Sequence, residues 1–133
     1  PYYIKPKMLQ ARMQKIADEY FGGVGTWYMT SATMLESGLK QLAILKEDAA
    51  LSGAKDLHEL MRAWENYHRI WSIEAHARHI QFREESRYPG YYYRGDFLAI
   101  NDKDWKCFVN SKFDPATGDW KCFKKEYKQL IPD

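Results

Sequence analysis

The stretch KDLHELMRAWENYHRIWSIEAHARHIQFREESRYPG, residues 55–90, carries the longest periodic pattern in the chain. Asp56 and Glu59 have the spacing of a helix N-terminal capping signal, and a Pro-Gly pair ends the pattern. Apolar residues recur between these signals within one narrow arc of a helix: Leu57, Leu60, Trp64, Trp71, Ala75 and Phe82. The pattern predicts one long helix that ends near residue 86 and is buried along the side that carries Trp64.

Two shorter helices are predicted upstream of this stretch. Pro6 is suited to the first turn of a helix that ends at Gly22-Gly23, and a second helix begins near Ser31 to Thr33 and ends at Ser52-Gly53. Thr33 and Glu36 have capping-box spacing at the start of the second helix. The predicted buried residues are Leu9, Met13, Ile16 and Tyr20 in the first helix and Leu35, Leu39, Leu42 and Ala49 in the second.

The last third of the chain changes to a strand pattern. Apolar and polar residues alternate from Trp105 to Asn110, residues 114–118 have turn chemistry, and a second strand runs from Trp120 to Tyr127. The fold expected is therefore mainly α, a three-helix bundle-like domain with a C-terminal two-stranded β-hairpin. We expect residues 1–133 to form a single domain, with a linker at 1–6, helices within 7–88 and the hairpin at 104–128.

The two cysteines lie on the two strands of the predicted hairpin. If the turn spans residues 114–118, Cys107 pairs near Lys125 or Glu126, three to four residues from Cys122. An offset of that size exceeds the reach of a disulfide. We therefore expect two small buried thiols, as is usual in a reducing cytoplasm.

Composition excludes several classes of protein. The 133 residues carry a formal net charge of +2, which argues against a strongly basic nucleic-acid binder. No apolar run approaches the ~18 residues that a membrane span needs. The glycines at 22, 23 and 25 follow a helix and not a strand, so the context of a dinucleotide-binding turn is missing, and no nucleophile motif is present.

Arginine and histidine gather on one side of the predicted third helix. Arg62, Arg69, His76, Arg83 and Arg87 follow steps of seven, seven, seven and four residues. Such a face suits docking to an acidic partner or a phosphate group, because arginine presents a planar fork of donors. A solvated face interleaved with glutamates is the alternative reading of the same pattern. A metal site is a further alternative, formed by Glu65, His68, His76 and His79, although only one Glu-x-x-His motif is present.

Two stretches resemble a known family. Residues 55–90 and the hairpin sequence from Trp105 to Phe113, with its turn, closely resemble the C-terminal part of the alpha subunit of dissimilatory adenylylsulfate reductase. More distantly, Glu85-Ser86-Arg87 followed by Asp104-Trp105 is similar to signatures in the C-terminal domain of succinate dehydrogenase and fumarate reductase flavoproteins.

The resemblance implies a cytoplasmic parent enzyme that interconverts adenylylsulfate with sulfite and AMP. The parent would carry FAD in its alpha subunit and iron–sulfur clusters in a beta subunit. Flavin and substrate residues would precede Pro1, so we assign no catalytic, cofactor or metal residue here and expect the isolated chain to be inactive. Its role would be packing on the upstream flavin domain and on the beta subunit, with no nucleic acid and no membrane span. The interface residues we expect are Arg69, His76, Arg83, Glu85, Ser86 and Arg87. A stand-alone helical interaction module with an arginine-rich binding face is the alternative.

Overall fold

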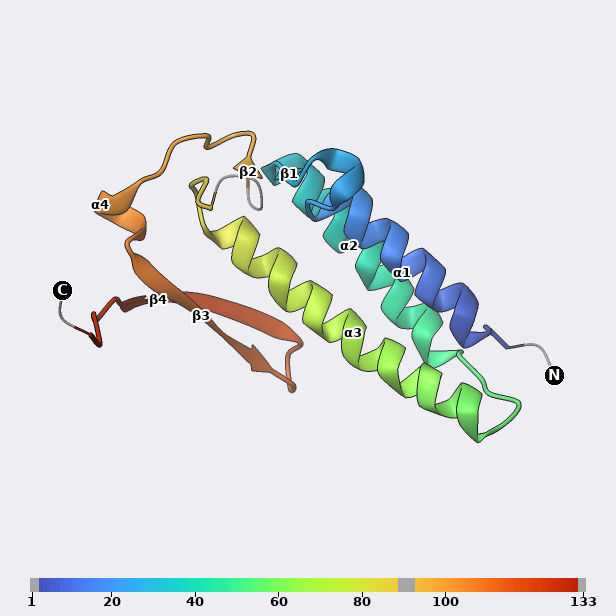
Figure 1. Cartoon of the computed structure of the whole chain (residues 1–133). Helices are drawn as coiled ribbons and strands as arrows, with labels where there is room; N and C mark the ends of the chain where they lie inside the picture. Colours follow the sequence, from blue (N-terminus) through green and yellow to red (C-terminus); the bar gives the residue numbers. More distant parts are fainter. Residues whose placement is uncertain (1–2, 89–92, 132–133) are drawn as a thin grey trace.

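A computed structural model describes residues 3–88 and 93–131. Within these ranges three long helices are followed by a β-hairpin (Figure 1). The long helices are α1 (Pro6–Tyr20), α2 (Ala32–Ala50) and α3 (Leu57–Phe82), and the hairpin strands are β3 (Cys107–Asp114) and β4 (Asp119–Glu126). The smaller elements are the 3-10 turn η1 (Val24–Thr26), the short helix α4 (Asp102–Trp105) and the two-residue strands β1 (Met29–Thr30) and β2 (Tyr93–Arg94). The predicted mainly α fold with a C-terminal hairpin is confirmed.

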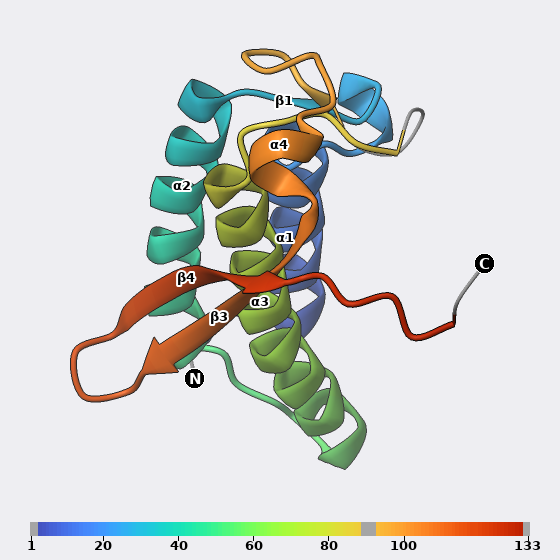
Figure 2. The same ribbon diagram turned by 90° about the vertical axis from the view of Figure 1, so that its left-hand side faces the viewer.

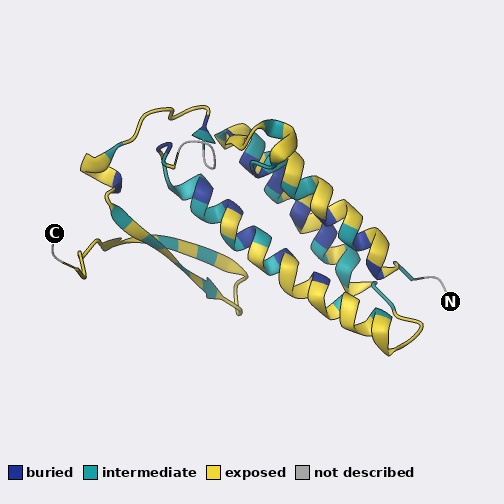
Figure 3. Cartoon of the chain, viewed as in Figure 1, coloured by how far each residue is buried: buried dark blue, intermediate teal, exposed yellow. Residues whose placement is uncertain are grey.

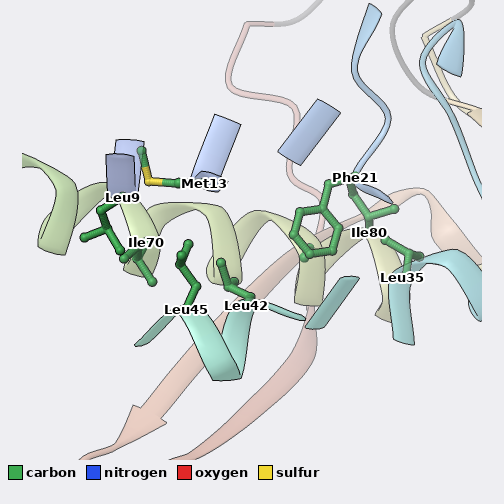
Figure 4. Packing of buried hydrophobic residues seen from close by; sticks show 9 residues of the cluster. Leu9, Met13, Phe21, Leu35, Leu42, Leu45, Ile70 and Ile80 are labelled. Atoms are coloured by element: carbon green, nitrogen blue, oxygen red, sulfur yellow. The ribbon is translucent and has the colours of Figure 1, made fainter. Parts of the chain in front are cut away.

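The hydrophobic core lies among the three long helices (Figure 4). Its fully buried members come from all three helices and from the end of the first: Leu9, Met13, Phe21, Leu35, Leu42, Leu45, Ile70, Ala77 and Ile80. Burial of each large aliphatic side chain contributes roughly 1.5–3 kcal/mol. The core thus fixes α3 against the α1–α2 pair.

The helix starts follow from local capping. Asp56 accepts a hydrogen bond from the Glu59 backbone N–H at 2.8 Å, as its spacing predicts. At the start of α2 the capping side chain is Ser31, whose Oγ accepts from Met34 N at 3.3 Å. The capping role predicted for Thr33 is therefore wrong, because the helix begins one residue before it.

The buried face of α3 is different from the one that its apolar pattern predicts. The residues buried in α3 are Asn66, Ile70, Glu74, Ala77 and Ile80. At 100° per residue their mean direction lies about 140° around the helix from the Trp64 stripe. Leu57, Leu60 and Trp64 are exposed, so the prediction of a core built on Trp64 is wrong.

Two polar residues explain why the pattern misled. Asn66 is 1% exposed and donates from Nδ2 to the Pro6 carbonyl at 2.8 Å, which ties α3 to the start of α1. Glu74 pairs with Lys46 on α2 and with Arg78, whose Nη2 lies 3.0 Å away. These contacts let the core tolerate a face that looks half polar in the sequence, although Asn66 Oδ1 is buried without a hydrogen-bond partner among the described residues.

The hairpin has the register predicted from its turn. Cys107 pairs with Glu126 and Ser111 pairs with Cys122, and both cysteines are free thiols. Gly118 closes the turn at φ +78°, a conformation that favours glycine. Burial raises the pKa of the Cys122 thiol.

The hairpin lies across α3 on the side away from α1 and α2 (Figure 2). Trp71 meets Phe113 edge to face, with ring centroids 4.7 Å apart, and lies 6.3 Å from Trp120. Farther along α3, Phe82 meets Trp105 in a T-shaped pair at 5.6 Å. The C-terminal half of the apolar stripe of α3 is therefore covered by aromatic rings of the tail.

The helix α3 ends at Phe82, four residues before the predicted end. Arg83 has an extended backbone and begins an irregular segment that contains the Glu-Ser-Arg sequence. Beyond the undescribed residues 89–92, β2 pairs in parallel with β1, so that Thr30 lies opposite Arg94. The sequence pattern did not predict this pairing or the helix α4.

Candidate interface site around Glu85

Glu85 stands at the centre of the segment that follows α3. Its side chain is fully buried, and its two oxygens accept four hydrogen bonds. Arg87 donates through Nε at 2.7 Å and Nη2 at 2.9 Å, Arg83 donates through Nη1 at 2.5 Å, and Asn101 donates from its backbone N–H at 3.0 Å. Arg83 and Arg87 thus brace the Glu-Ser-Arg turn from both sides of Glu85 in the sequence.

These donors decide the charge of Glu85. Burial alone would raise the pKa of the carboxyl, but the hydrogen bonds from Arg87, Asn101 and Arg83 outweigh burial and lower it. The same contacts raise the pKa of Arg87. Glu85 is therefore an ionised, fully engaged carboxylate, which suits it to hold structure and not to accept a proton from a substrate.

Arg83 and Arg87 also bind neighbouring elements and so connect Glu85 to them. Arg83 donates to the Trp105 carbonyl at 2.9 Å and to the Cys107 carbonyl at 2.8 Å, which fixes the start of the hairpin. Arg87 reaches Asp102 at 2.7 Å in the first turn of α4. One buried carboxylate thus organises the end of α3, α4 and the hairpin.

Ser86 joins the same centre to the β1–β2 link. Its Oγ donates to the Phe97 carbonyl at 2.8 Å and accepts from the Arg94 backbone N–H at 2.8 Å. Ser86 is 5% exposed. The hydroxyl therefore acts as an internal connector.

Arg94 is the largest fully buried side chain of the described residues. Its Nη1 donates to the carbonyls of Ile80 at 2.7 Å and Arg83 at 3.0 Å, at the C-terminal end of α3. Its Nε and Nη2 bind both oxygens of Asp96 at 2.9 and 2.7 Å, and Asp96 accepts from the Ala32 backbone N–H at 3.0 Å. The hydrogen bonds from Arg94, against the opposing effect of burial, lower the pKa of Asp96.

A groove of about 700 Å³ runs beside the Glu85 centre. Its walls come from the last turns of α3, from α4 and from the hairpin, and include His76, His79, Arg87, Trp105 and Tyr127. His79 Nδ1 lies 2.6 Å from the Ala75 carbonyl. The groove is open and combines aromatic walls with cationic groups, which makes it suited to contact with another protein surface.

The predicted interface residues separate into two groups. Arg69 and His76 are exposed on α3, where Arg69 lies 3.3 Å from Glu65. Burial of the His76 ring nevertheless lowers its pKa, and repulsion from the nearby His79 lowers it further. Arg83, Glu85, Ser86 and Arg87 lie beyond the end of the helix and bind each other and the tail. The prediction of one continuous helical arginine face is therefore wrong, because α3 ends before Arg83.

The described residues lack two features that mark many cofactor sites, a metal-binding cluster and a dinucleotide cradle. They contain no group of three or more His, Cys, Asp or Glu side chains that could hold a metal ion. Nor do they provide a strand, glycine-rich turn and helix in the order that cradles a dinucleotide, since Gly22-Gly23 follows α1.

Sequence reasoning missed Arg94, Asp96 and Lys46. Arg94 contacts carbonyls 11 to 14 residues away, Asp96 contacts Ala32 across 64 residues, and Lys46 contacts Glu74 across 28. No periodic pattern reports contacts of this range. An isolated Arg-x-Asp after a Glu-Ser-Arg turn was the one available signal.

The fold is that of a known class of helical domain. A chain of the Sdh1 complex of Mycobacterium smegmatis shares it with a TM-score of 0.71 and 18% identity, over 98% of this chain and 22% of that one. No family model matches the sequence. Among described residues no helix is long and apolar enough to cross a membrane.

Much stronger similarity connects the chain to adenylylsulfate reductase. It is 57% identical over 132 residues to adenylylsulfate reductase subunit alpha of Megalodesulfovibrio gigas, a match that covers 99% of this chain and 20% of the relative. The adenylylsulfate reductase structure from Archaeoglobus fulgidus matches with a TM-score of 0.96 and 52% identity, over 99% of this chain and 21% of that one. A structure of adenosine-5-phosphosulfate reductase as a covalent adduct with sulfite matches equally well. The resemblance drawn from the sequence is confirmed, and the chain spans about a fifth of the length of the curated relative.

Proposed function

We propose that this chain is the C-terminal helical domain of the alpha subunit of an adenylylsulfate reductase. The observation that carries the proposal is identity of 57% and a TM-score of 0.96 over essentially the whole chain, including the hairpin. The parent would reduce adenylylsulfate to sulfite and AMP, or run in reverse during sulfur oxidation. A stand-alone interaction module is not favoured, since the match extends over 99% of the chain to relatives about five times longer.

The whole protein would be a flavoprotein that binds FAD upstream of Pro1 and works with an iron–sulfur beta subunit. We place it in the cytoplasm, where thiols such as Cys107 and Cys122 stay reduced. Residues 1–133 would form one domain that holds no cofactor and has no activity alone. The structural role proposed for this domain is supported by Glu85, whose carboxylate accepts four hydrogen bonds from residues of this chain.

Within the parent, the domain would serve packing and assembly. Arg69 and His76 would contact the upstream flavin domain or the beta subunit directly, since both are exposed on α3. Arg83, Glu85, Ser86 and Arg87 would hold the Glu-Ser-Arg turn and the groove beside it in the shape that the neighbour meets. Their part is positional, because each is bound to other residues of this chain.

The test uses the whole protein from which the chain derives. We expect purified alpha subunit to carry flavin absorbance, and the separately expressed residues 1–133 to carry none. Stoichiometric FAD bound by residues 1–133 would overturn the proposal, as would an alpha subunit without flavin. For the interface, the double variant Arg69→Glu, His76→Glu should weaken alpha–beta association or flavin retention. The control is the charge reversal Lys40→Glu on the outer side of α2, which should leave both unchanged.

A further inference from the structure

The N-terminal half of α3 is largely exposed (Figure 3), and several of its exposed residues are large and apolar. The surface, here called the α3 aromatic patch, consists of Leu57, Leu60, Met61, Trp64 and Tyr67. Leu57 is 81% exposed, Met61 62% and Trp64 58%. Contiguous apolar surface of this kind marks a place where another protein surface docks.

The patch continues a stripe that is covered elsewhere. On the C-terminal half of α3, Trp71 packs on Phe113 and Trp120, and Phe82 packs on Trp105. The rings on the N-terminal half lie on the same side of the helix but meet no such cover among residues 3–88 and 93–131. The hairpin therefore packs on only the C-terminal half of this apolar face, and the N-terminal half is left for another segment or protein to bury.

The rings of the patch contact one another. Trp64 stacks on His68, with centroids 5.5 Å apart and planes 23° apart, and meets Tyr67 edge to face at 6.2 Å. Tyr67 in turn meets Trp71 at 6.3 Å, which links the patch to the covered half. Because these contacts already restrict the side chains of the patch, they lose little conformational freedom when another surface packs on them.

The start of the described chain lies near the patch. Ile4 forms a parallel bridge with Ser52, donating from its N–H to the Leu51 carbonyl at 3.2 Å and accepting from Gly53 N–H at 3.2 Å. Residues 53–56 lead directly into Leu57. The chain therefore enters the fold at the end of the bundle where the patch begins (Figure 1).

We propose that the α3 aromatic patch is the docking surface for the part of the same polypeptide that precedes Pro1. This rests on the proposed function, in which the chain is the last fifth of a longer alpha subunit. A polypeptide that enters beside residues 51–53 is tethered next to the patch, so its effective concentration there exceeds that of any separate subunit. The Trp64 stripe is then an interface within the alpha subunit, and the hairpin with the upstream polypeptide covers the whole face of α3.

The test is cysteine labelling in the full-length alpha subunit. Trp64→Cys and Leu57→Cys are made separately, since the more exposed Leu57 can be replaced even if loss of the Trp64 ring disturbs folding. The modification of each new cysteine by a maleimide is followed by peptide mass spectrometry, in the alpha subunit alone, in the alpha–beta complex and in urea. Ala77→Cys in the buried core is the matched protected reference, and the urea sample is the fully accessible one.

The proposal expects both patch cysteines to react at least about tenfold more slowly in the folded alpha subunit alone than in urea. Rapid labelling in the alpha subunit with protection only in the complex would overturn it, because the beta subunit would then be the cover. Rapid labelling in both would also overturn it, because the patch would face solvent. Failure of the proposed function gives a different result: an alpha subunit without flavin, whatever the labelling rates.

Discussion

Arg94 and Asp96 form a two-pronged salt bridge that joins the end of α3 to the start of α2. The guanidinium binds carbonyls at the C-terminal end of α3, and the carboxylate accepts from the first N–H of α2. Each charge lies at the helix end whose dipole it complements. The pair, with guanidinium-to-carboxylate distances of 2.9 and 2.7 Å, thus stabilises the end of one helix and the start of another, and its carboxylate contacts α2 across 64 residues of sequence.

Loss of this guanidinium should be among the most damaging single changes in the domain. Arg94→Met removes the guanidinium that binds Asp96 and the carbonyls of Ile80, Gln81 and Arg83, and we expect a loss of about 3–5 kcal/mol in the free energy of unfolding. Urea unfolding followed by circular dichroism measures it. Lys40→Met removes the exposed pair with Glu36, which solvent screens, and should cost far less. Equal effects of the two changes would contradict the role given to Arg94.

Stability should fall in acid because of Glu85. Its folded pKa is lowered below the ordinary 4.5, so the folded state binds fewer protons than the unfolded state near that pH. The stabilisation is therefore fully present above about pH 4.5 and is lost as pH falls through the folded value. The pKa of Asp96 is likewise lowered from its ordinary 3.8, so Asp96 adds to the same trend at lower pH.

Glu85→Gln tests this pH dependence. We expect a variant that is less stable at pH 7 and whose stability changes less between pH 6 and pH 3, as measured by thermal unfolding across that range. Glu47→Gln, on the exposed side of α2, controls for the loss of one carboxylate. An unchanged acid slope in Glu85→Gln would assign the acid sensitivity to other groups.

The two tryptophans of α3 should respond very differently to truncation. Trp71→Ala removes contacts with Phe113, Trp120 and the Lys46 ammonium 4.0 Å above the ring. Because the ring is only half-buried, we expect the free energy of unfolding to fall by about 3 kcal/mol, the lower end of the range for a core aromatic residue. Trp64→Ala should change the stability of the isolated chain by about 0.5 kcal/mol or less. A larger cost at Trp64 than at Trp71 would restore the Trp64-centred core that the sequence pattern predicts.

The hairpin turn should depend on one backbone conformation. Gly118 has φ +78° and no atom lies within 4 Å of the position a Cβ would take, so Gly118→Ala adds strain without a clash. We expect a loss of about 1–2 kcal/mol, and less for Gly118→Asn. The melting temperature of each variant measures this order, and a neutral Gly118→Ala would show that the turn relaxes.

Local patterns predicted the hairpin well. Its turn lies between residues 114 and 118, and that alone sets the register that places Cys107 opposite Glu126. The N-terminal cap at Asp56 and the bracing of Glu85 by Arg83 and Arg87 are also short-range features. In each case the interacting residues lie within a few positions of one another or are fixed by one turn.

The buried face of α3 and the Arg94–Asp96 bridge were beyond the reach of such patterns. Hydrophobic periodicity selected the side with Trp64 because the core side carries Asn66 and Glu74, whose partners lie on other helices. The pattern thus detected the more apolar face, and we assign its N-terminal half to docking with polypeptide outside this chain. Which residues that polypeptide contributes is determined by contacts across domains, which periodicity within one helix does not encode.

The central claim is that this domain packs and positions parts of an adenylylsulfate reductase whose chemistry lies upstream. The most direct measurement is adenylylsulfate-dependent sulfite release by the complete alpha–beta protein, compared with residues 1–133 alone, with a reduced viologen dye added to supply the two electrons. We predict sulfite release by the complete protein and none by the isolated chain. A complete, flavin-loaded protein that neither releases sulfite from adenylylsulfate nor catalyses the reverse reaction would contradict the account.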